Sequence, residues 1–272
     1  MDIKNKHILL VSGNSFFIIA TIIVNALAVI LPLNGKTTQE LSDNLPNLFV
    51  PAGITFSIWS IIYTFLIIFM IYQILSLIKK QQYDTSYLEK IGVFFIIASL
   101  ANIIWIFLWH YELVVFSLLA MLVLFISLLI IYLKLNISLS SVSLKEKLAV
   151  HVTISIYLGW ITVATIANVT AVLVKQNVGE LLLGQVTWTI LVIAVATLIS
   201  VLILIQRKDI AYNLVIIWAL IGIVIKRTSA DPIFGIQTNI AITAVIAILI
   251  IILTIFVKFV SAVYKKTSKV QK

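Results

Sequence analysis

The sequence contains no cysteine and few charged residues, and each deficit excludes a class of protein. Without cysteine the chain has no disulfide framework, no thiolate metal site and no cysteine nucleophile. Charged residues make up only 11% of the 272 residues, whereas soluble domains carry about 25%. These figures argue against a water-soluble enzyme, a nucleic-acid-binding protein and a disordered chain.

Acidic residues are missing from the long apolar runs as well. All ten Asp and Glu residues fall at or beyond the ends of these runs, and His151 lies near the start of one. Proton relays and carboxylate-bound metals in membranes need an ionisable group at mid-depth. Glycine forms no GxGxxG or P-loop pattern, which argues against a nucleotide-driven machine. The sequence therefore supports neither a proton-relay mechanism nor a metal site.

What the sequence has in abundance is apolar residues, at 62%. One membrane-spanning helix takes roughly 20 of them, so the chain can supply roughly eight spans. The fold class predicted is all-α, a polytopic integral membrane helical bundle with about eight transmembrane helices. The seventh run is the shortest, and the first is too long for a cleaved signal peptide. The predicted spans are 8–31, 54–78, 91–110, 113–133, 148–174, 186–205, 210–225 and 237–258.

The distribution of positive charges among the loops tests the predicted spans independently, because cytoplasmic loops are enriched in Lys and Arg. With both termini cytoplasmic, fifteen of the 19 positive residues lie inside. This bias predicts a multi-pass protein of the cell membrane. The four outside are Lys36, Lys175, Lys226 and Arg227, the last two being exceptions at the end of the seventh run. The fifteen inside are Lys4, Lys6, Lys79, Lys80, Lys90, Lys134, Lys145, Lys147, Arg207, Lys208, Lys258, Lys265, Lys266, Lys269 and Lys272.

Polar and aromatic residues recur at helical spacing within several runs. Asn14, Thr21 and Asn25 share one face of the first run, and Asn102 and Trp105 share one face of the third. Such residues often form interhelical hydrogen bonds, worth about 0.6 kcal/mol each, or interfacial aromatic belts. Trp105 and Trp160 lie deep in their runs, which favours an apolar pocket with a few polar anchors.

Three segments resemble one known family. PAGITFSIW at 51–59, followed by Tyr63, is similar to the start of the second helix in the TspO/MBR family of tryptophan-rich sensory and translocator proteins. NIIW at 102–105 and YLGWITVATIAN at 157–168 resemble its third- and fifth-helix motifs. The resemblance covers roughly residues 8–175. It implies two domains, a five-helix bundle over 1–175 and three additional transmembrane helices with a basic cytoplasmic tail over 176–272.

The resemblance implies that a flat apolar ligand, such as a porphyrin or haem, binds inside the bundle. The family's sterol-associated tyrosine is Val169 here, which argues against a sterol. The loop 32–53 is expected to cover the pocket from outside. The ligand-binding residues implied are Trp59, Tyr63, Asn102, Trp105, Trp160, Ala164 and Asn168.

The residues leave two alternatives to such a sensory or receptor-like protein. One is a secondary transporter of a small apolar or amphipathic solute. The other is a tetrapyrrole-modifying enzyme, although no acid–base pair supports it and the chain is predicted not to be an enzyme. The partners expected are a small apolar ligand and the lipid bilayer, with a homodimer as a further possibility. The basic tail at 265–269 is expected to favour anionic lipid.

Overall fold

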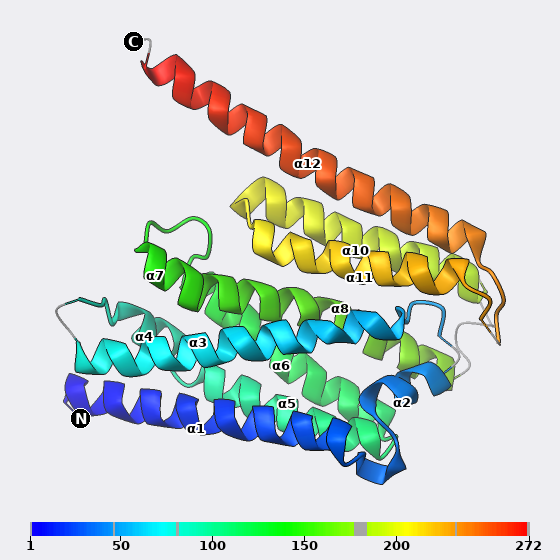
Figure 1. Cartoon of the computed structure of the whole chain (residues 1–272), viewed down its shortest axis with the longest axis horizontal. Coiled ribbons are helices and arrows are strands. Elements are labelled where there is room, and N and C mark those ends of the chain that lie inside the picture. Colours follow the sequence, from blue (N-terminus) through cyan, green and yellow to red (C-terminus); the bar gives the residue numbers. More distant parts are fainter. Residues whose placement is uncertain (1, 46, 80–81, 177–183, 232, 271–272) are drawn as a thin grey trace.

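The computed structural model describes residues 2–45, 47–79, 82–176, 184–231 and 233–270, and this part of the chain forms a helical bundle without strands (Figure 1). The long helices lie roughly side by side, and the N- and C-termini lie at the same end of the bundle. Lys80 and Lys272, which entered the charge analysis, lie outside the described residues.

Eight long helices account for the predicted spans. Seven of them are long and apolar enough to cross a membrane, and α5, with 17 residues, is shorter. The polytopic all-α fold is therefore confirmed. The long helices are α1 (Ile3–Ile30), α3 (Ile58–Ile78), α5 (Phe94–His110), α6 (Val114–Lys134), α8 (Val152–Lys175), α10 (Gln185–Arg207), α11 (Ile210–Thr228) and α12 (Thr238–Val270).

Short helical segments extend or connect the long ones. The 3₁₀ turn η2 leads directly into α3, and α7 and the π-helical turn η3 lead into α8. The short segments are η1 (Leu33–Gly35), α2 (Thr38–Asn44), η2 (Gly53–Ser57), α4 (Ser86–Ile91), α7 (Leu144–Glu146) and η3 (Lys147–His151).

The expectation that the seventh span is the shortest is wrong. The corresponding helix, α11, has 19 residues and is longer than α5. Gly92 is the physical reason, because it adopts a φ of 53° and ends α4 before α5 begins. A left-handed backbone conformation of this kind is accessible to glycine at little cost. The predicted third span therefore loses Ile91 to α4 and residues 92–93 to the turn, whereas α11 continues to Thr228, beyond the predicted end at 225.

The tight turn between α10 and α11 is encoded locally. Lys208 adopts a left-handed conformation, with a φ of 61°, and ends α10. The Asp209 carboxylate then accepts the backbone N–H of Tyr212 at 3.2 Å and caps the start of α11. Capping satisfies one of the donors that a helix leaves unpaired at its N-terminus. The two helices can therefore run antiparallel with almost no loop.

Helix α8 is central and joins the predicted five-helix unit to the last three helices. It packs against α3 and α6 on one side and α11 on the other. Gly159 makes this approach close, because a Cβ there would lie 3.0 Å from the Tyr212 carbonyl oxygen and 3.2 Å from the Val215 Cβ. The division into domains at 175 and 176 stays a prediction.

The polar face predicted on α1 points into the bundle. Asn14 and Asn25 are 1% and 5% exposed. The Asn14 side-chain amide donates to the Gln73 Oε1 at 2.7 Å, and that of Asn25 donates to the Asn102 Oδ1 at 2.7 Å. These contacts are interhelical hydrogen bonds of the kind that holds membrane helices together.

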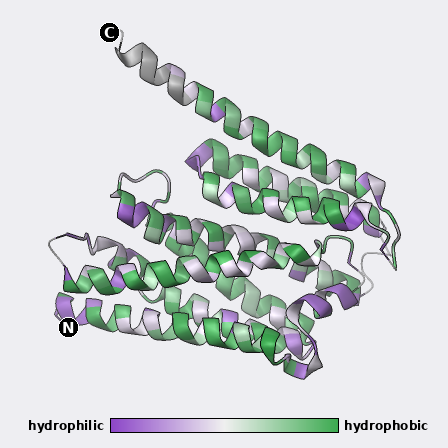
Figure 2. Ribbon diagram, in the orientation of Figure 1, coloured by the Kyte–Doolittle hydropathy of each residue, from purple (hydrophilic) through white to green (hydrophobic). Residues whose placement is uncertain are grey.

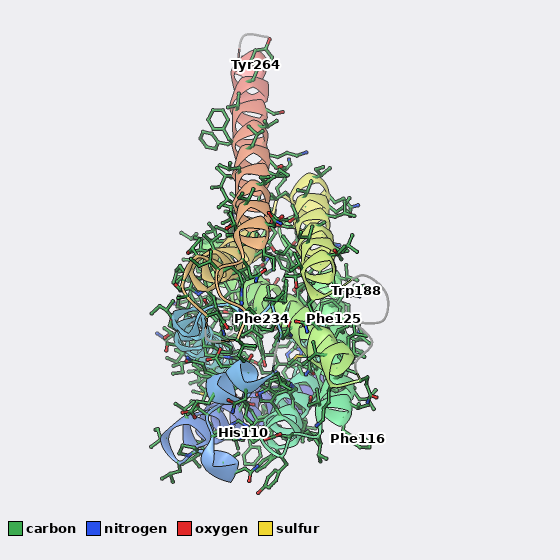
Figure 3. The ribbon with its side chains drawn as sticks, turned by 90° about the vertical axis from the view of Figure 1, so that its right-hand side faces the viewer. His110, Phe116, Phe125, Trp188, Phe234 and Tyr264 are labelled. Carbon is green, nitrogen blue, oxygen red and sulfur yellow. The ribbon has the colours of Figure 1, made fainter. Side chains whose placement is uncertain are left out.

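Apolar residues run along the full length of the helices, and hydrophilic residues gather near their ends (Figure 2). Every acidic residue that the structure describes lies in a loop, in a short helix or at a helix end, as predicted. Viewed from the side, α12 extends well beyond its neighbours, with Tyr264 near its far end (Figure 3).

Candidate functional site

A cavity with mostly apolar walls lies at the end of the bundle away from the termini, where the outer loop (residues 31–57) folds over the helices. Its volume is about 50 Å³, smaller than that of an open ligand site, which is roughly 300–1,000 Å³. The space is narrow, because large aromatic rings approach one another across it. We call it the aromatic cavity; its walls include Phe56, Trp59, Trp105, Trp109, Trp160, Ala164, Ala167, Asn168 and Ala171.

Three helices each bring tryptophan to this cavity. Trp59 comes from the first turn of α3, Trp105 and Trp109 from the last turns of α5, and Trp160 from the middle of α8. The Trp59 and Trp160 rings meet edge to face, with centroids 6.2 Å apart and an angle of 82° between their planes. Trp105 and Trp109 are stacked at 6.0 Å and 22°. Edge and face surfaces are therefore both available to a flat ligand.

Two of these rings carry an unused hydrogen-bond donor. The indole N–H groups of Trp105 and Trp160 are buried and find no acceptor among the described residues. A buried donor without a partner costs free energy comparable to a lost hydrogen bond. A carbonyl or carboxylate oxygen of a ligand could remove this cost. Trp109 differs, because its indole N–H donates to the Thr38 carbonyl at 3.4 Å.

Small residues on α8 leave the space opposite the rings. Ala164, Ala167 and Ala171 follow one another at three- and four-residue steps along the cavity wall, which keeps them on one face of the helix. Asn168 belongs to the same wall, and its amide donates to the Ser117 Oγ on α6 at 3.1 Å. The side chain of Asn168 is thereby held in a fixed orientation.

The structure places five of the seven sequence-predicted residues on the cavity wall: Trp59, Trp105, Trp160, Ala164 and Asn168. The remaining two lie behind it. Tyr63 stacks on Trp59 with centroids 5.5 Å apart, and Asn102 bonds to Asn25 on α1. Whether any of the seven binds a ligand stays a prediction.

The outer loop closes the end of the cavity, as expected for the loop 32–53. Thr38, Ser42 and Asn47 contribute to the cavity wall. The Asn47 amide donates to the Thr170 Oγ1 on α8 at 2.6 Å, and His110 at the end of α5 lies within 3.4 Å of the Thr38 hydroxyl. Figure 3 shows His110 beside the loop at this end of the bundle. The loop is therefore tied to both α5 and α8.

The outer loop also carries its own local order. Thr37 and Glu40 form a reciprocal capping box at the start of α2. The backbone N–H and the hydroxyl of Thr37 both donate to the Glu40 carboxylate and lower the pKa of Glu40 below its usual value. The box fixes where α2 begins and so positions Thr38 and Ser42 over the cavity.

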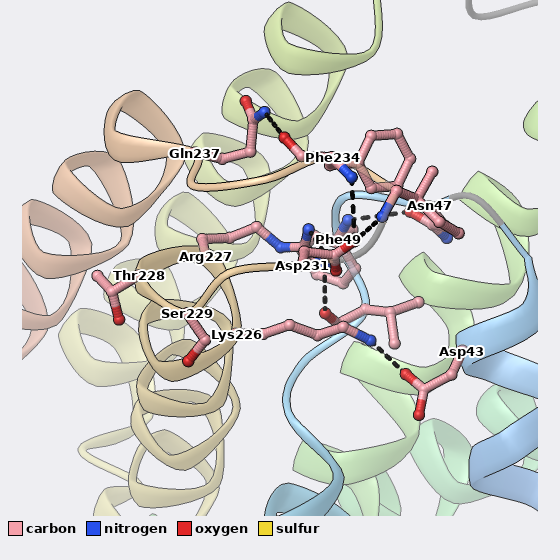
Figure 4. Close-up of polar contacts among 12 residues, drawn as sticks. Asp43, Asn47, Phe49, Lys226, Arg227, Thr228, Ser229, Asp231, Phe234 and Gln237 are labelled. Atoms are coloured by element: carbon pink, nitrogen blue, oxygen red, sulfur yellow. Dashed lines mark hydrogen bonds and ion pairs between the residues drawn. The ribbon is translucent and has the colours of Figure 1, made fainter.

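Helix α11 holds the outer loop from the other side. The Trp218 indole N–H donates to the Thr55 carbonyl at 3.0 Å, and the Ala52 N–H donates to the Gly222 carbonyl at 2.9 Å. Further along α11, Lys226 forms an ion pair with Asp43 (Figure 4). These contacts come at about one-turn intervals, so one face of α11 supports the loop along much of its length.

Arg227 is the deepest charge in this contact, with only 1% of its surface exposed. Its guanidinium donates to the Val50 carbonyl at 3.4 Å and lies 3.4 Å from the Asp231 carboxylate (Figure 4). Burial raises the pKa of Asp231, but the N–H groups of Ile233 and Phe234 and the charge of Arg227 lower it by more, so its pKa is below the usual value. The two positive residues that departed from the charge bias are thus paired with acids.

Sequence reasoning missed the support from α11. Trp218 and Gly222 stand four residues apart on one helical face, but nothing in the sequence says which loop they meet. A Cβ at Gly222 would lie 1.9 Å from the Thr55 Oγ1 and 2.9 Å from the Pro51 Cβ. A glycine one turn after a tryptophan in an apolar run could have marked a close approach.

Comparison with known protein families identifies a relationship over most of the chain. The model of a family described as TSPO-like protein matches residues 9–257 of the chain. The match extends through α10 and α11 and most of α12, beyond the segment 8–175 on which the sequence motifs lie. No curated protein and no solved structure matches the chain.

Proposed function

Because the chain belongs to the TSPO-like protein family, we propose that it is a membrane sensory protein that binds a flat apolar ligand in the aromatic cavity. The ligand class is that of a porphyrin or another planar macrocycle. The observation that carries the proposal is the convergence of Trp59, Trp105 and Trp160 from three helices on one cavity. The proposal assigns binding, and no catalytic step, to the chain's own residues.

The chemistry of the walls fits a ligand with a flat apolar body and a polar edge. Ring faces and edges supply apolar contact and stacking, worth roughly 0.5–1.5 kcal/mol for each aromatic pair beyond the area buried. The free N–H groups of Trp105 and Trp160 supply two donors for an oxygen at the ligand's edge. Because the cavity is narrow, a macrocycle enters only when the outer loop moves outward.

Titration of the purified protein in detergent with protoporphyrin IX tests the proposal. Binding should quench tryptophan fluorescence, because the cavity holds four of the six tryptophans of the chain. In the variant combining Trp105→Phe and Trp160→Phe, we expect both reduced quenching and at least tenfold weaker binding, measured by the porphyrin's own absorbance. Trp188→Phe, a change in α10 away from the cavity, serves as the control. Unchanged affinity in the double variant would contradict the proposed site.

A further inference from the structure

A second hollow lies at the opposite end of the bundle, at the end that the charge bias assigns to the cytoplasm. Its volume is about 490 Å³. Three segments meet around it: the loop after α6, the turn leading into α8, and the tight turn between α10 and α11. We call it the cytoplasmic crevice. Nothing in the proposed function uses it.

One face of the helical segment leading into α8 forms its polar side. Lys147, His151 and Ser155 follow one another at four-residue steps and therefore share that face. His151 is only 4% exposed. Its ring forms no hydrogen bond with any described residue, and the nearest carboxylate, that of Glu146, is 4.0 Å away. A buried imidazole that lines a crevice without a partner is a donor or acceptor available to a ligand.

The one carboxylate on the crevice wall, that of Asp209, is already engaged. It accepts the Ser155 hydroxyl at 2.6 Å and the Tyr212 N–H at 3.2 Å. Lys147 and Lys208 are both exposed and form no ion pair with any residue that the structure describes. The two exposed lysines outweigh the single buried carboxylate, so the charge that the crevice presents to a ligand is positive.

Hydroxyl groups complete the polar side. Ser138 and Ser141 are exposed on the crevice wall. Their loop is compact, because Asn136 and Ser138 adopt positive φ values of 52° and 64° and the Asn136 carbonyl accepts the N–H groups of Leu139 and Ser140 at 3.0 Å. Lysine ammonium groups and serine hydroxyls at a helical bundle's cytoplasmic end are suited to a phosphate group.

The remaining wall is apolar and lies exposed on the outside of the bundle. Ile210 and Leu214, one turn apart on α11, line the crevice and are 50% and 56% exposed. They continue from the charged end toward the apolar part of the helix. A ligand that fits both walls has a phosphate at one end and a hydrocarbon chain at the other.

We propose that the cytoplasmic crevice binds the phosphate group of an anionic inner-leaflet phospholipid, with its acyl chain along the first turns of α11. Lys147, Lys208 and the His151 ring contact the phosphate, and the exposed serines lie at its rim. The site joins the loop after α6 to the α10–α11 turn. Bound lipid would therefore hold the last three helices against α8.

Reconstitution into nanodiscs tests this site. One sample contains phosphatidylcholine alone, a second adds phosphatidylglycerol as the minor component, and a third adds inorganic phosphate to phosphatidylcholine. We expect phosphatidylglycerol to raise the melting temperature and to remain bound in native mass spectrometry. Combining Lys147→Ala and Lys208→Ala should weaken retention of phosphatidylglycerol by about fivefold for each lysine, since each charge near the surface contributes about 1 kcal/mol.

A matched control separates the crevice from general surface charge. Lys4→Ala combined with Lys79→Ala removes the same charge from the same end of the bundle but leaves the crevice intact. Equal loss of lipid in both double variants would overturn the proposal, as would stabilisation by inorganic phosphate equal to that by phosphatidylglycerol. His151→Leu tests the contribution of the imidazole without removing a lysine. Unchanged lipid retention in this variant would show that the imidazole does not contact the phosphate. Porphyrin binding should be unaffected in all three variants.

Discussion

Tryptophan and alanine residues have different roles in the aromatic cavity. The rings of Trp59, Trp105 and Trp160 supply its large surfaces, and the alanines of α8 keep the space between them open. The volume of the side chains at the alanine positions therefore decides whether a flat ligand fits, independently of any hydrogen bond. This makes the α8 wall the simplest place to test occupancy of the cavity.

Ala164→Phe should weaken porphyrin binding by at least about tenfold, because the new ring occupies the space that the ligand needs. The change also forces neighbouring rings to shift, at a cost of about 1–3 kcal/mol in stability. The measurement is an absorbance titration with protoporphyrin IX. Ala194→Phe on an exposed position of α10 introduces the same ring outside the cavity, and it should bind as the unmodified protein does. Equal binding in both variants would place the ligand elsewhere.

Asn102, which the family resemblance implies as a ligand-binding residue, forms a contact between helices in the structure. Its Oδ1 accepts a hydrogen bond from Asn25 on α1, and its side chain is not on the cavity wall. We expect Asn102→Leu to lower the free energy of unfolding by about 1 kcal/mol, in the range of interhelical hydrogen bonds in membranes. Affinity for protoporphyrin IX should change less than twofold. Thermal unfolding measures the stability of the variant, and titration of the same sample measures its affinity. A large loss of affinity with unchanged stability would show that Asn102 contacts the ligand.

At the scale of elements, the outer loop and α11 form one unit. Gly222 allows this, because its lack of a side chain lets Pro51 and Thr55 approach the helix backbone. The segment that α11 supports also contributes Asn47, Val50 and Pro51 to the cavity wall. A substitution on α11, at a residue that does not line the cavity, should therefore still alter the cavity.

Gly222→Ala should displace the segment 51–55, because the added methyl group cannot be placed 1.9 Å from the Thr55 Oγ1. We expect the loop to open more readily, so that porphyrin association and dissociation both become faster in stopped-flow fluorescence. Gly13→Ala gives a comparison on α1, since there the added Cβ meets only the flexible end of the Ile96 side chain. If Gly222→Ala leaves both rates unchanged, α11 does not control access.

The fold could be predicted from the sequence wherever the information is local. The apolar runs fixed the long helices, and the spacing of Asn14 and Asn25 fixed the inward face of α1, because both depend only on helical geometry. The support of the outer loop by Trp218 and Lys226 could not be predicted in this way, since these contacts join segments more than 150 residues apart. Tyr63 and Asn102 are predicted to line the site but lie behind the cavity wall. Helical spacing shows which residues share a face, and it does not distinguish the wall of a cavity from the layer behind it.

At the scale of the whole molecule, the two hollows lie at opposite ends and have opposite character. The aromatic cavity lies beneath the outer loop, and the cytoplasmic crevice lies between the loop after α6 and the α10–α11 turn. Helix α8 reaches both, with His151 just before its first residue and Ala171 near its last. Which hollow faces the cytoplasm depends on the orientation in the membrane, which the charge bias predicts.

The absence of cysteine makes that orientation directly measurable, because a single introduced thiol is the only one in the chain. Ser141→Cys and Ser229→Cys replace exposed serines at the two ends of the bundle without changing any charge. With both termini cytoplasmic, a membrane-impermeant maleimide should label Ser229→Cys in intact cells but Ser141→Cys only after permeabilisation. The unmodified protein gives the background. The reverse pattern would turn the aromatic cavity toward the cytoplasm, and it would remove the crevice from the leaflet in which its lysines are expected to meet lipid phosphate.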